Sequence, residues 1–126
     1  MKTFYFHVLL EEYEKTLDKL VSTTLRSAKS VVLMAPYCIE PNRNDAMRAR
    51  MDEYGAVVKK ISAKRKTLFV DTQAAFDAIL ENCHPNALAW DRVHPSQIGH
   101  MVIARAFLDA VGFEWNRNGI SKQGNL

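Results

Sequence analysis

Residues 31–36 read VVLMAP, a short unbroken apolar run that ends at a proline. Such a run is typical of a strand that is buried on both faces, as the strands of parallel sheets are. A second run, TLFVD at residues 67–71, is rich in strand-forming residues and ends on a polar one. These segments predict parallel strands near 31–35 and 67–71, and the surrounding sequence must supply the helices that cover them.

Apolar residues at spacings of three and four surround both strands and predict helices. The first stripe covers residues 9–28, and the second runs from Met47 to Ile61. A short third helix is expected around residues 76–80, and a last one from Met101 to Val111, ended by Gly112. Residues 82–95 read as a loop, and a polar tail covers residues 114–126.

The order of these elements is helix, strand, helix, strand, helix, loop, helix, which predicts an α/β fold with a parallel sheet. The 126 residues suffice for one domain and are too few for two. Two strands are few, because a parallel sheet needs cover on both faces and along most of its edges. We therefore expect residues 1–126 to form a single partial α/β domain.

The composition favours a packed protein without a membrane anchor. Hydrophobic residues make up 48% of the chain, which predicts a core rather than disorder. No apolar run approaches membrane-spanning length, and the opening MKTFYFHVLL continues into acidic residues without a cleavage site, unlike a signal peptide. Cys38 and Cys83 form no metal or redox pattern, and nothing else suggests secretion. We expect a cytoplasmic protein.

The net charge is +3, and the densest basic run closes the second predicted helix. It comprises Lys59, Lys60, Lys64, Arg65 and Lys66, where cations suit the carbonyl end of the helix dipole. A solvated helix face is the favoured interpretation, and a nucleic-acid patch is the alternative. Because no recognisable nucleic-acid-binding motif accompanies the run, we expect no nucleic-acid partner.

The candidate chemistry lies in AWDRVHPSQIGH at residues 89–100. Asp91 and His94 stand three positions apart, and a carboxylate so placed can fix the tautomer of an imidazole and stabilise its protonated form. The loop that carries them can reach the carboxyl ends of the strands, where ligands bind in open α/β sheets. By spacing alone, a structural cap or a surface pair is the more frequent outcome.

The residues after His94 fit the start of a helix. Pro95 disfavours helical geometry at His94, and either Pro95 or Ser96 suits the first position of the last helix. Gly99 has no side chain, so this helix can approach the loop closely. No set of histidine, cysteine or acidic residues has zinc spacing, and there is no glycine-rich phosphate loop, so we expect neither metal nor cofactor.

The segment DRVHPSQIGHMVIARAFL resembles the last block of the SGNH (GDSL) hydrolases, in which Asp-x-x-His supplies the acid and base of a catalytic triad. A wider similarity, to the carboxyl-terminal half of SGNH-type acetylxylan esterases, covers residues 7 to about 116. It is carried by the runs HVLLEEYEKTLDKLV, VVLMAPYCIEPNRNDAMRARMDEYGAVVKKI, LFVDTQAAFDAILE and ALAWDRVHPSQIGHMVIARAFLDAVGFEW. Those esterases are intracellular and remove acetyl groups from xylo-oligosaccharides.

This resemblance implies part of a three-layer α/β/α, flavodoxin-like SGNH fold. It also implies that Asp91 is the acid and His94 the base of the triad, with an acetylated oligosaccharide as substrate of the whole enzyme. Trp90 stands beside them, where an aromatic side chain would meet a sugar ring or a neighbouring subunit. The alternative for Trp90 is packing within the loop.

The chain departs from the family at the nucleophile. The family places its serine in a Gly-Asp-Ser block after the first strand and its oxyanion donors on a glycine and on the asparagine of Gly-x-Asn-Asp. Here the first glycine is Gly55, no serine has the family context, and Asn44-Asp45 lacks a preceding glycine. We therefore expect the nucleophile to belong to a segment outside these 126 residues.

Two functional interpretations remain open. The first is a serine ester hydrolase, a xylo-oligosaccharide acetyl esterase represented by its carboxyl-terminal part, either truncated or split and served by a complementing amino-terminal half. The second is a non-catalytic relic or interaction module that binds through an exposed sheet edge. In the isolated chain the run 31–35 would present an unpaired edge, so we expect either a homo-oligomer or pairing with a complementing amino-terminal half.

Overall fold

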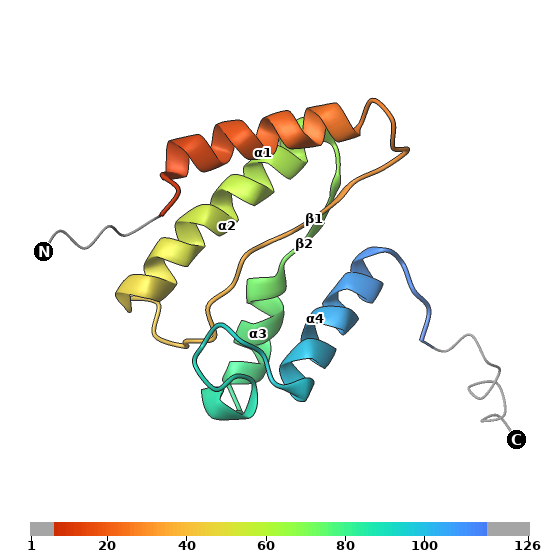
Figure 1. The fold of residues 1–126 in the computed structure, drawn as a ribbon. Helices are drawn as coiled ribbons and strands as arrows, with labels where there is room; N and C mark the ends of the chain where they lie inside the picture. The colour runs from red at the N-terminus through yellow and green to blue at the C-terminus, as the bar shows by residue number, and fades with distance from the viewer. Residues whose placement is uncertain (1–6, 116–126) are drawn as a thin grey trace, which may run out of the picture.

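The computed structural model describes residues 7–115, over which the chain forms helices around a pair of strands (Figure 1). The elements are α1 (Leu10–Thr24), β1 (Val32–Met34), α2 (Ala46–Arg65), β2 (Leu68–Val70), α3 (Thr72–Leu80), the short 3-10 helix η1 (Pro85–Ala87) and α4 (Gln97–Ala110). Their order confirms the predicted one, and η1 lies within the predicted loop 82–95. Most of the expected tail lies outside the described residues. Of the helices between residues 7 and 115, none is long and apolar enough to cross a membrane.

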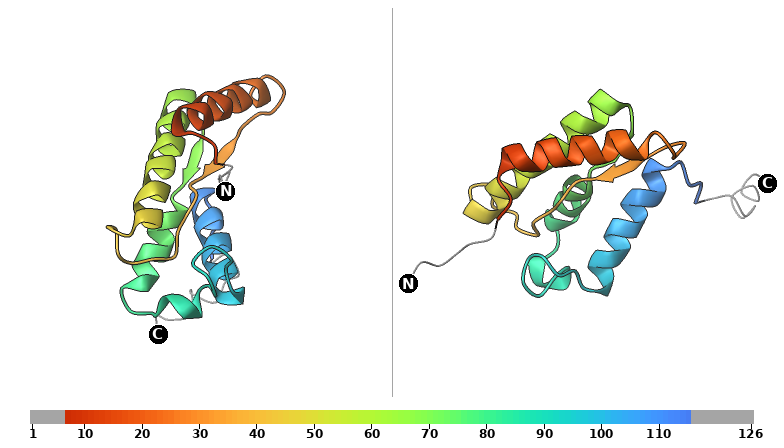
Figure 2. Two further views of the ribbon diagram at one scale, coloured as in Figure 1. Left: turned by 60° about the vertical axis from the view of Figure 1, so that its left-hand side comes forward. Right: turned by 45° about the horizontal axis from the view of Figure 1, so that its top comes forward.

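The two strands pair in parallel, with Met34 opposite Val70, which confirms the predicted α/β class. α1 and α2 pack against the face that carries Leu33 and Phe69. α4 approaches β2 from the other side, so the strands lie between helices, as the left view of Figure 2 shows. Because both strands run in one direction, residues 35–45 and residues 71–80 leave the sheet at the same end.

The larger hydrophobic cluster joins α1, α2 and β1. Its buried members are Val21, Leu33, Val57, Val58 and Ile61. Leu33 comes from the predicted strand, and the others belong to the apolar stripes of the first two predicted helices. Leu10, Tyr13, Leu17 and Leu25 pack against it from α1 and the residue that follows this helix. The periodicity of three and four therefore corresponds to the faces that the helices bury.

The first helix is shorter than the predicted 9–28, because it ends at Thr24. The Thr24 hydroxyl donates to the carbonyl of Leu20, and the hydroxyl of Ser27 donates to the carbonyl of Thr24. Such local side-chain bonds give the main chain an alternative to further helical turns. The turn they support returns the chain to the start of β1.

The prediction that residues 31–35 are buried on both faces is wrong for this chain. Leu33 and Ala35 are buried, but Met34 is 37% exposed and Leu68 on β2 is 44% exposed. Within the described residues, β1 pairs only with β2, so the outer edge of β1 has no strand beside it. The side of the sheet that carries Met34 therefore stays partly open.

The basic run of α2 joins this helix to α1. Lys60 pairs with Glu14, while Lys64 and Arg65 both pair with Asp18. The hydrogen bonds from Arg65 and Lys64 lower the pKa of Asp18 strongly, so this carboxylate stays ionised well into acid. These cations therefore lie at a helix–helix contact, and Lys60 and Lys64 keep side chains that are 66% and 58% exposed, as on the expected solvated helix face.

We expect the purified 126-residue chain to self-associate through the outer edge of β1. Burial of an exposed apolar side chain such as Met34 by a partner is worth up to about 1.5–3 kcal/mol. The substitution Met34→Lys should shift the population toward monomer, because a charge on an edge strand opposes pairing. Size-exclusion chromatography with light scattering measures the mass.

Leu20→Lys is the matched control, because it places the same charge on the exposed surface of α1, where Leu20 is 58% exposed. It should leave the mass unchanged. A wild-type chain that stays monomeric at all concentrations and unfolds cooperatively in urea would refute the expectation.

Candidate active site

The loop that carries Asp91 and His94 is closed at its base. Ala89 and Pro95 form an antiparallel bridge, and the N–H of Ser96 donates to the carbonyl of Leu88 at 2.7 Å. Leu88 and Ala89 are 0% and 2% exposed, and they pack in a second core cluster with Ile39, Phe76 and Val102. The base of the loop is therefore part of the core, although the sequence suggests only a surface connection.

Gly99 allows α4 to pack directly on this loop. A Cβ atom at Gly99 would lie 2.4 Å from the main-chain oxygen of Leu88 and 2.7 Å from the Cβ of Pro95. Ser96 is the N-cap of α4, because its hydroxyl accepts from the N–H of Gly99 at 3.3 Å. The predicted close approach is confirmed, and Ser96 rather than Pro95 is the residue that caps the helix.

Asp91 and His94 form a direct pair within the loop. One carboxylate oxygen of Asp91, Oδ1, accepts from the main-chain N–H groups of Val93 and His94 at 3.1 and 2.8 Å. The other, Oδ2, lies 2.5 Å from Nδ1 of His94. The carboxylate therefore holds both the main chain and the ring of the histidine.

These contacts determine which nitrogen of His94 can act as a base. Hydrogen bonds lower the pKa of Asp91 from 3.8 to about 2. The largest effect comes from the N–H of His94, the next from its ring and a smaller one from the N–H of Val93. The ionised carboxylate can only accept hydrogen bonds, so in the neutral imidazole Nδ1 carries the proton and Nε2 keeps its lone pair. The His94 side chain is 80% exposed, which leaves Nε2 accessible to a reacting group.

The loop is anchored to residues 36–45, which follow β1. The N–H of Ile39 donates to the carbonyl of Arg92 at 2.9 Å, and the hydroxyl of Tyr37 donates to the carbonyl of Val93 at 3.3 Å. The Asp91–His94 pair is thus attached to the segment that leaves the carboxyl end of the sheet, as expected. Tyr37, Ile39 and Arg92 were not predicted, because no local pattern marks contacts between segments so far apart in the chain.

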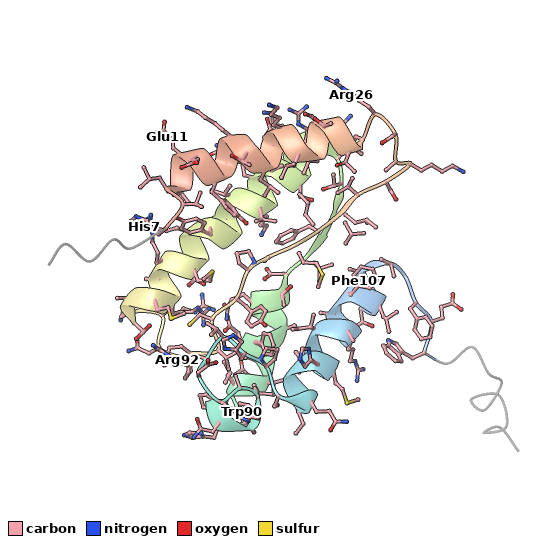
Figure 3. The ribbon with its side chains drawn as sticks, viewed as in Figure 1. His7, Glu11, Arg26, Trp90, Arg92 and Phe107 are labelled. Atoms are coloured by element: carbon pink, nitrogen blue, oxygen red, sulfur yellow. The ribbon has the colours of Figure 1, made fainter. Side chains whose placement is uncertain are left out.

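Trp90 does not pack within the loop, so that alternative is wrong. Its side chain is 88% exposed, directly beside Asp91, and Figure 3 shows it at the outer part of the loop. An exposed indole of this size presents a flat apolar surface to the solvent. It is available to a ligand or to another subunit.

Four serine hydroxyls within residues 7–115 make structural hydrogen bonds. Those of Ser22, Ser27, Ser62 and Ser96 each donate to a main-chain carbonyl. Asp45, of the Asn44-Asp45 sequence, is the N-cap of α2 and accepts from the N–H groups of Met47 and Arg48. Asn44-Asp45 therefore belongs to the start of a helix. Residues 7–115 contain no group of three histidine, cysteine or acidic side chains placed to hold a metal ion.

No protein-family model matches the chain. An acetylxylan esterase from Geobacillus stearothermophilus is 56% identical over 112 residues, which make up 89% of this chain and 51% of that protein. The chain is homologous to acetylxylan esterases. It spans about half the length of this curated relative.

Solved structures agree with the sequence match. The crystal structure of Axe2, the acetylxylan esterase of G. stearothermophilus, superposes with a TM-score of 0.87 and 56% identity over 89% of this chain and 51% of Axe2. LAE5, an α/β hydrolase enzyme from the metagenome of Lake Arreo, gives a TM-score of 0.86 and 53% identity over the same shares. The chain therefore has part of the SGNH fold of Axe2.

Mutants of Axe2 indicate where the reaction occurs in that enzyme. Its catalytic mutants replace a serine, an aspartate and a histidine with alanine. The aspartate and the histidine are three positions apart, and another mutant replaces the tryptophan directly before the aspartate. The serine precedes the aspartate by more residues than this chain contains.

Gly99→Ala should destabilise the chain. Although alanine favours helices over glycine by up to about 1 kcal/mol, the new Cβ would overlap the carbonyl of Leu88, and overpacking of this kind typically costs about 1–3 kcal/mol. Urea unfolding followed by circular dichroism measures the difference.

Gly55→Ala in α2 is the matched control, because a Cβ there would meet nothing within 4 Å. It should be neutral or stabilising by up to about 1 kcal/mol. If Gly99→Ala and the wild type have equal free energies of unfolding, the loop can move to accommodate the new Cβ at no cost in stability, which would contradict the prediction.

Proposed function

We propose that the chain carries the acid–base part of a serine esterase site that removes acetyl groups from xylo-oligosaccharides. The observation that carries the proposal is the Asp91–His94 pair, in which an ionised carboxylate orients Nδ1 and leaves Nε2 accessible. Asp91 and His94 have the spacing of the aspartate and histidine altered in the catalytic mutants of Axe2. Axe2 is also described as an acetyl-xylooligosaccharide esterase, in the structures of two of its mutants.

In the proposed reaction, Nε2 of His94 takes the proton of a serine hydroxyl as the serine attacks the acetyl carbonyl carbon. Oxyanion donors hold the tetrahedral intermediate, and His94 then gives the proton to the departing sugar oxygen. A water molecule, deprotonated by His94, attacks the acetyl-serine, and His94 returns this proton to the serine oxygen as acetate leaves. Asp91 stays ionised throughout and stabilises the imidazolium that forms twice in each cycle.

The proposed nucleophile and oxyanion donors come from an amino-terminal half of the same fold. This is supported by the occupied serine hydroxyls of this chain and by the distant serine of Axe2. We place that half along the outer edge of β1, where the strand has no partner among the described residues. Trp90, next to Asp91 and largely exposed, would lie against the sugar of the acetylated substrate.

A second candidate function is a non-catalytic module that binds another chain through the same edge. The observation that favours it is the partly open side of the sheet, where Met34 and Leu68 are exposed. A cytoplasmic location suits either function, because Cys38 and Cys83 are free thiols. The esterase should become active when an amino-terminal half supplies the nucleophile, whereas the binding module should stay inactive.

The 126-residue chain alone should hydrolyse p-nitrophenyl acetate no faster than about an equal concentration of imidazole. Without a nucleophile and oxyanion donors, only general-base catalysis by His94 remains, and loss of triad members typically costs several powers of ten. Steady-state kinetics and mass spectrometry of the quenched reaction measure this. Saturable turnover with an acetylated serine would show that a serine of this chain acts.

Fusion of the amino-terminal half of Axe2 ahead of this chain should give an active esterase that depends on His94 and Asp91. His94→Ala removes the proton acceptor, and Asp91→Asn favours the wrong tautomer, with an expected loss in kcat of roughly 10⁴-fold, the magnitude known from the serine-protease triad. Release of acetate from acetylated xylo-oligosaccharides is the measurement.

His100→Ala is the control for these variants, because His100 lies exposed on α4 outside the pair. It should keep nearly full activity. Near-full activity in His94→Ala or Asp91→Asn would refute the site, and a folded but inactive fusion would favour the binding module.

A further inference from the structure

Arg92 lies between the two candidate triad residues and has an unusual main-chain conformation. Its φ angle is +71°, and the one other non-glycine residue with positive φ within residues 7–115 is Lys66, which ends α2. The left-handed conformation is unfavourable for a residue with a side chain. It persists where surrounding contacts hold it, often at functional sites.

The main chain at Arg92 and directly after it is held by the segment after β1. The carbonyl of Arg92 accepts from the N–H of Ile39, a fully buried residue of the second core cluster. The turn at Arg92 separates Asp91 from the N–H groups of Val93 and His94, both of which donate back to the Asp91 carboxylate. The conformation of this one residue therefore determines whether these bonds can form.

The side chain of Arg92 adds a second connection. Its Nη1 lies 3.1 Å from Oδ2 of Asp45 and 3.3 Å from Oε2 of Glu40. Asp45 uses its other oxygen to cap α2, so the guanidinium links the loop to the first turn of that helix. In Figure 3, Arg92 lies between the loop and the start of α2.

The acceptors of Arg92 are themselves held in place. Arg48, only 2% exposed, donates to the carbonyl of Glu40 at 2.7 Å and to both carboxylate oxygens of Asp77 at 2.7 and 2.8 Å. The N–H of Arg48 also lowers the pKa of Asp45, and the hydrogen bond from the Arg92 side chain lowers it further. Arg92 thus binds Asp45, whose lowered pKa keeps its carboxylate ionised, and Glu40, whose main chain is held by Arg48.

We propose that the Arg92 side chain is a positioning residue that, through Asp45, holds the loop in the conformation in which Asp91 orients His94. Exposed ion pairs usually add little to stability. If the Arg92–Asp45 pair contributed to stability alone, its removal would leave the geometry of the Asp91–His94 pair unchanged. The positioning role instead predicts a change in the geometry of the Asp91–His94 pair. Its catalytic consequence rests on the proposed esterase function, whereas its effect on the pair does not.

Two variants of the full chain test this role. Arg92→Gly removes the guanidinium but still permits a positive φ, and Asp45→Asn keeps a good helix cap while removing the charge that Arg92 binds. Arg50→Ala is the control, because it removes another arginine ion pair of α2, to Glu53, away from the loop. Urea unfolding shows whether each variant is folded.

Nitrogen-15 spectra of the His94 ring at pH 8 provide the first readout. Wild type and Arg50→Ala should show the Nδ1–H tautomer, whereas Arg92→Gly and Asp45→Asn should show a mixture of both tautomers. In the same two variants, carboxyl carbon-13 titration should show the pKa of Asp91 rising from about 2 toward its ordinary value of 3.8, because the bonds to its carboxylate are weakened. An unchanged tautomer and an unchanged Asp91 pKa in both folded variants would overturn the proposal.

The fused esterase provides the second readout. Arg92→Gly and Asp45→Asn should lower kcat by roughly 10- to 100-fold with little change in KM, because a misplaced base retards the reaction more than binding. Suppose that the two variants of the chain show mixed tautomers but the fusion with the amino-terminal half of Axe2 never becomes active. This result would support the positioning role and refute the esterase. Normal kcat in both variants alongside dependence on His94 would refute the positioning role and support the esterase.

Discussion

Parallel pairing of β1 with β2 is the constraint on which the arrangement of the molecule depends. It sends the segment 36–45 and helix α3 away from the same end of the sheet, where the Asp91–His94 loop meets them. The loop that carries Asp91 and His94 is bound to the sheet through Tyr37 and Ile39, which follow the end of β1 in the chain. An antiparallel pair would place these groups at opposite ends, and the loop would have nothing to rest against.

The Asp91–His94 pair needs no residue outside the described chain for its own geometry. The carboxylate, the two N–H groups that it accepts and the imidazole all lie within four consecutive residues. The base of the loop is closed by main-chain bonds and by packing of α4 at Gly99. Orientation of the base thus uses only groups within the described residues, while the proposed attack on an ester requires a second set of groups from elsewhere in the fold.

The features that could be predicted from the sequence are those with a local signal. Apolar spacing marked the strands and helices, the Asp-x-x-His spacing marked the pair, and the absence of a side chain at Gly99 marked the close helix. The role of Arg92 could not be predicted, because Glu40 and the Tyr37 hydroxyl reach residues 92 and 93 across 52 and 56 positions. Nor could the sequence distinguish Arg48, with a 2% exposed side chain, from Arg43, with a 73% exposed one. The difference depends on tertiary structure, because Arg48 lies between the Glu40 carbonyl and Asp77, whereas Arg43 reaches Asp77 from the surface.

The buried guanidinium of Arg48 also affects how the molecule opens. It joins α2, the segment 36–45 and α3 through Asp77 and the Glu40 carbonyl, and to break one of these contacts would leave a charge in the interior without its partner. Local opening of the segment is therefore costly, although it has no regular secondary structure. Its amide hydrogens should exchange with solvent through the same cooperative transition as those of the neighbouring helices, so that this irregular segment and its helices unfold as one unit.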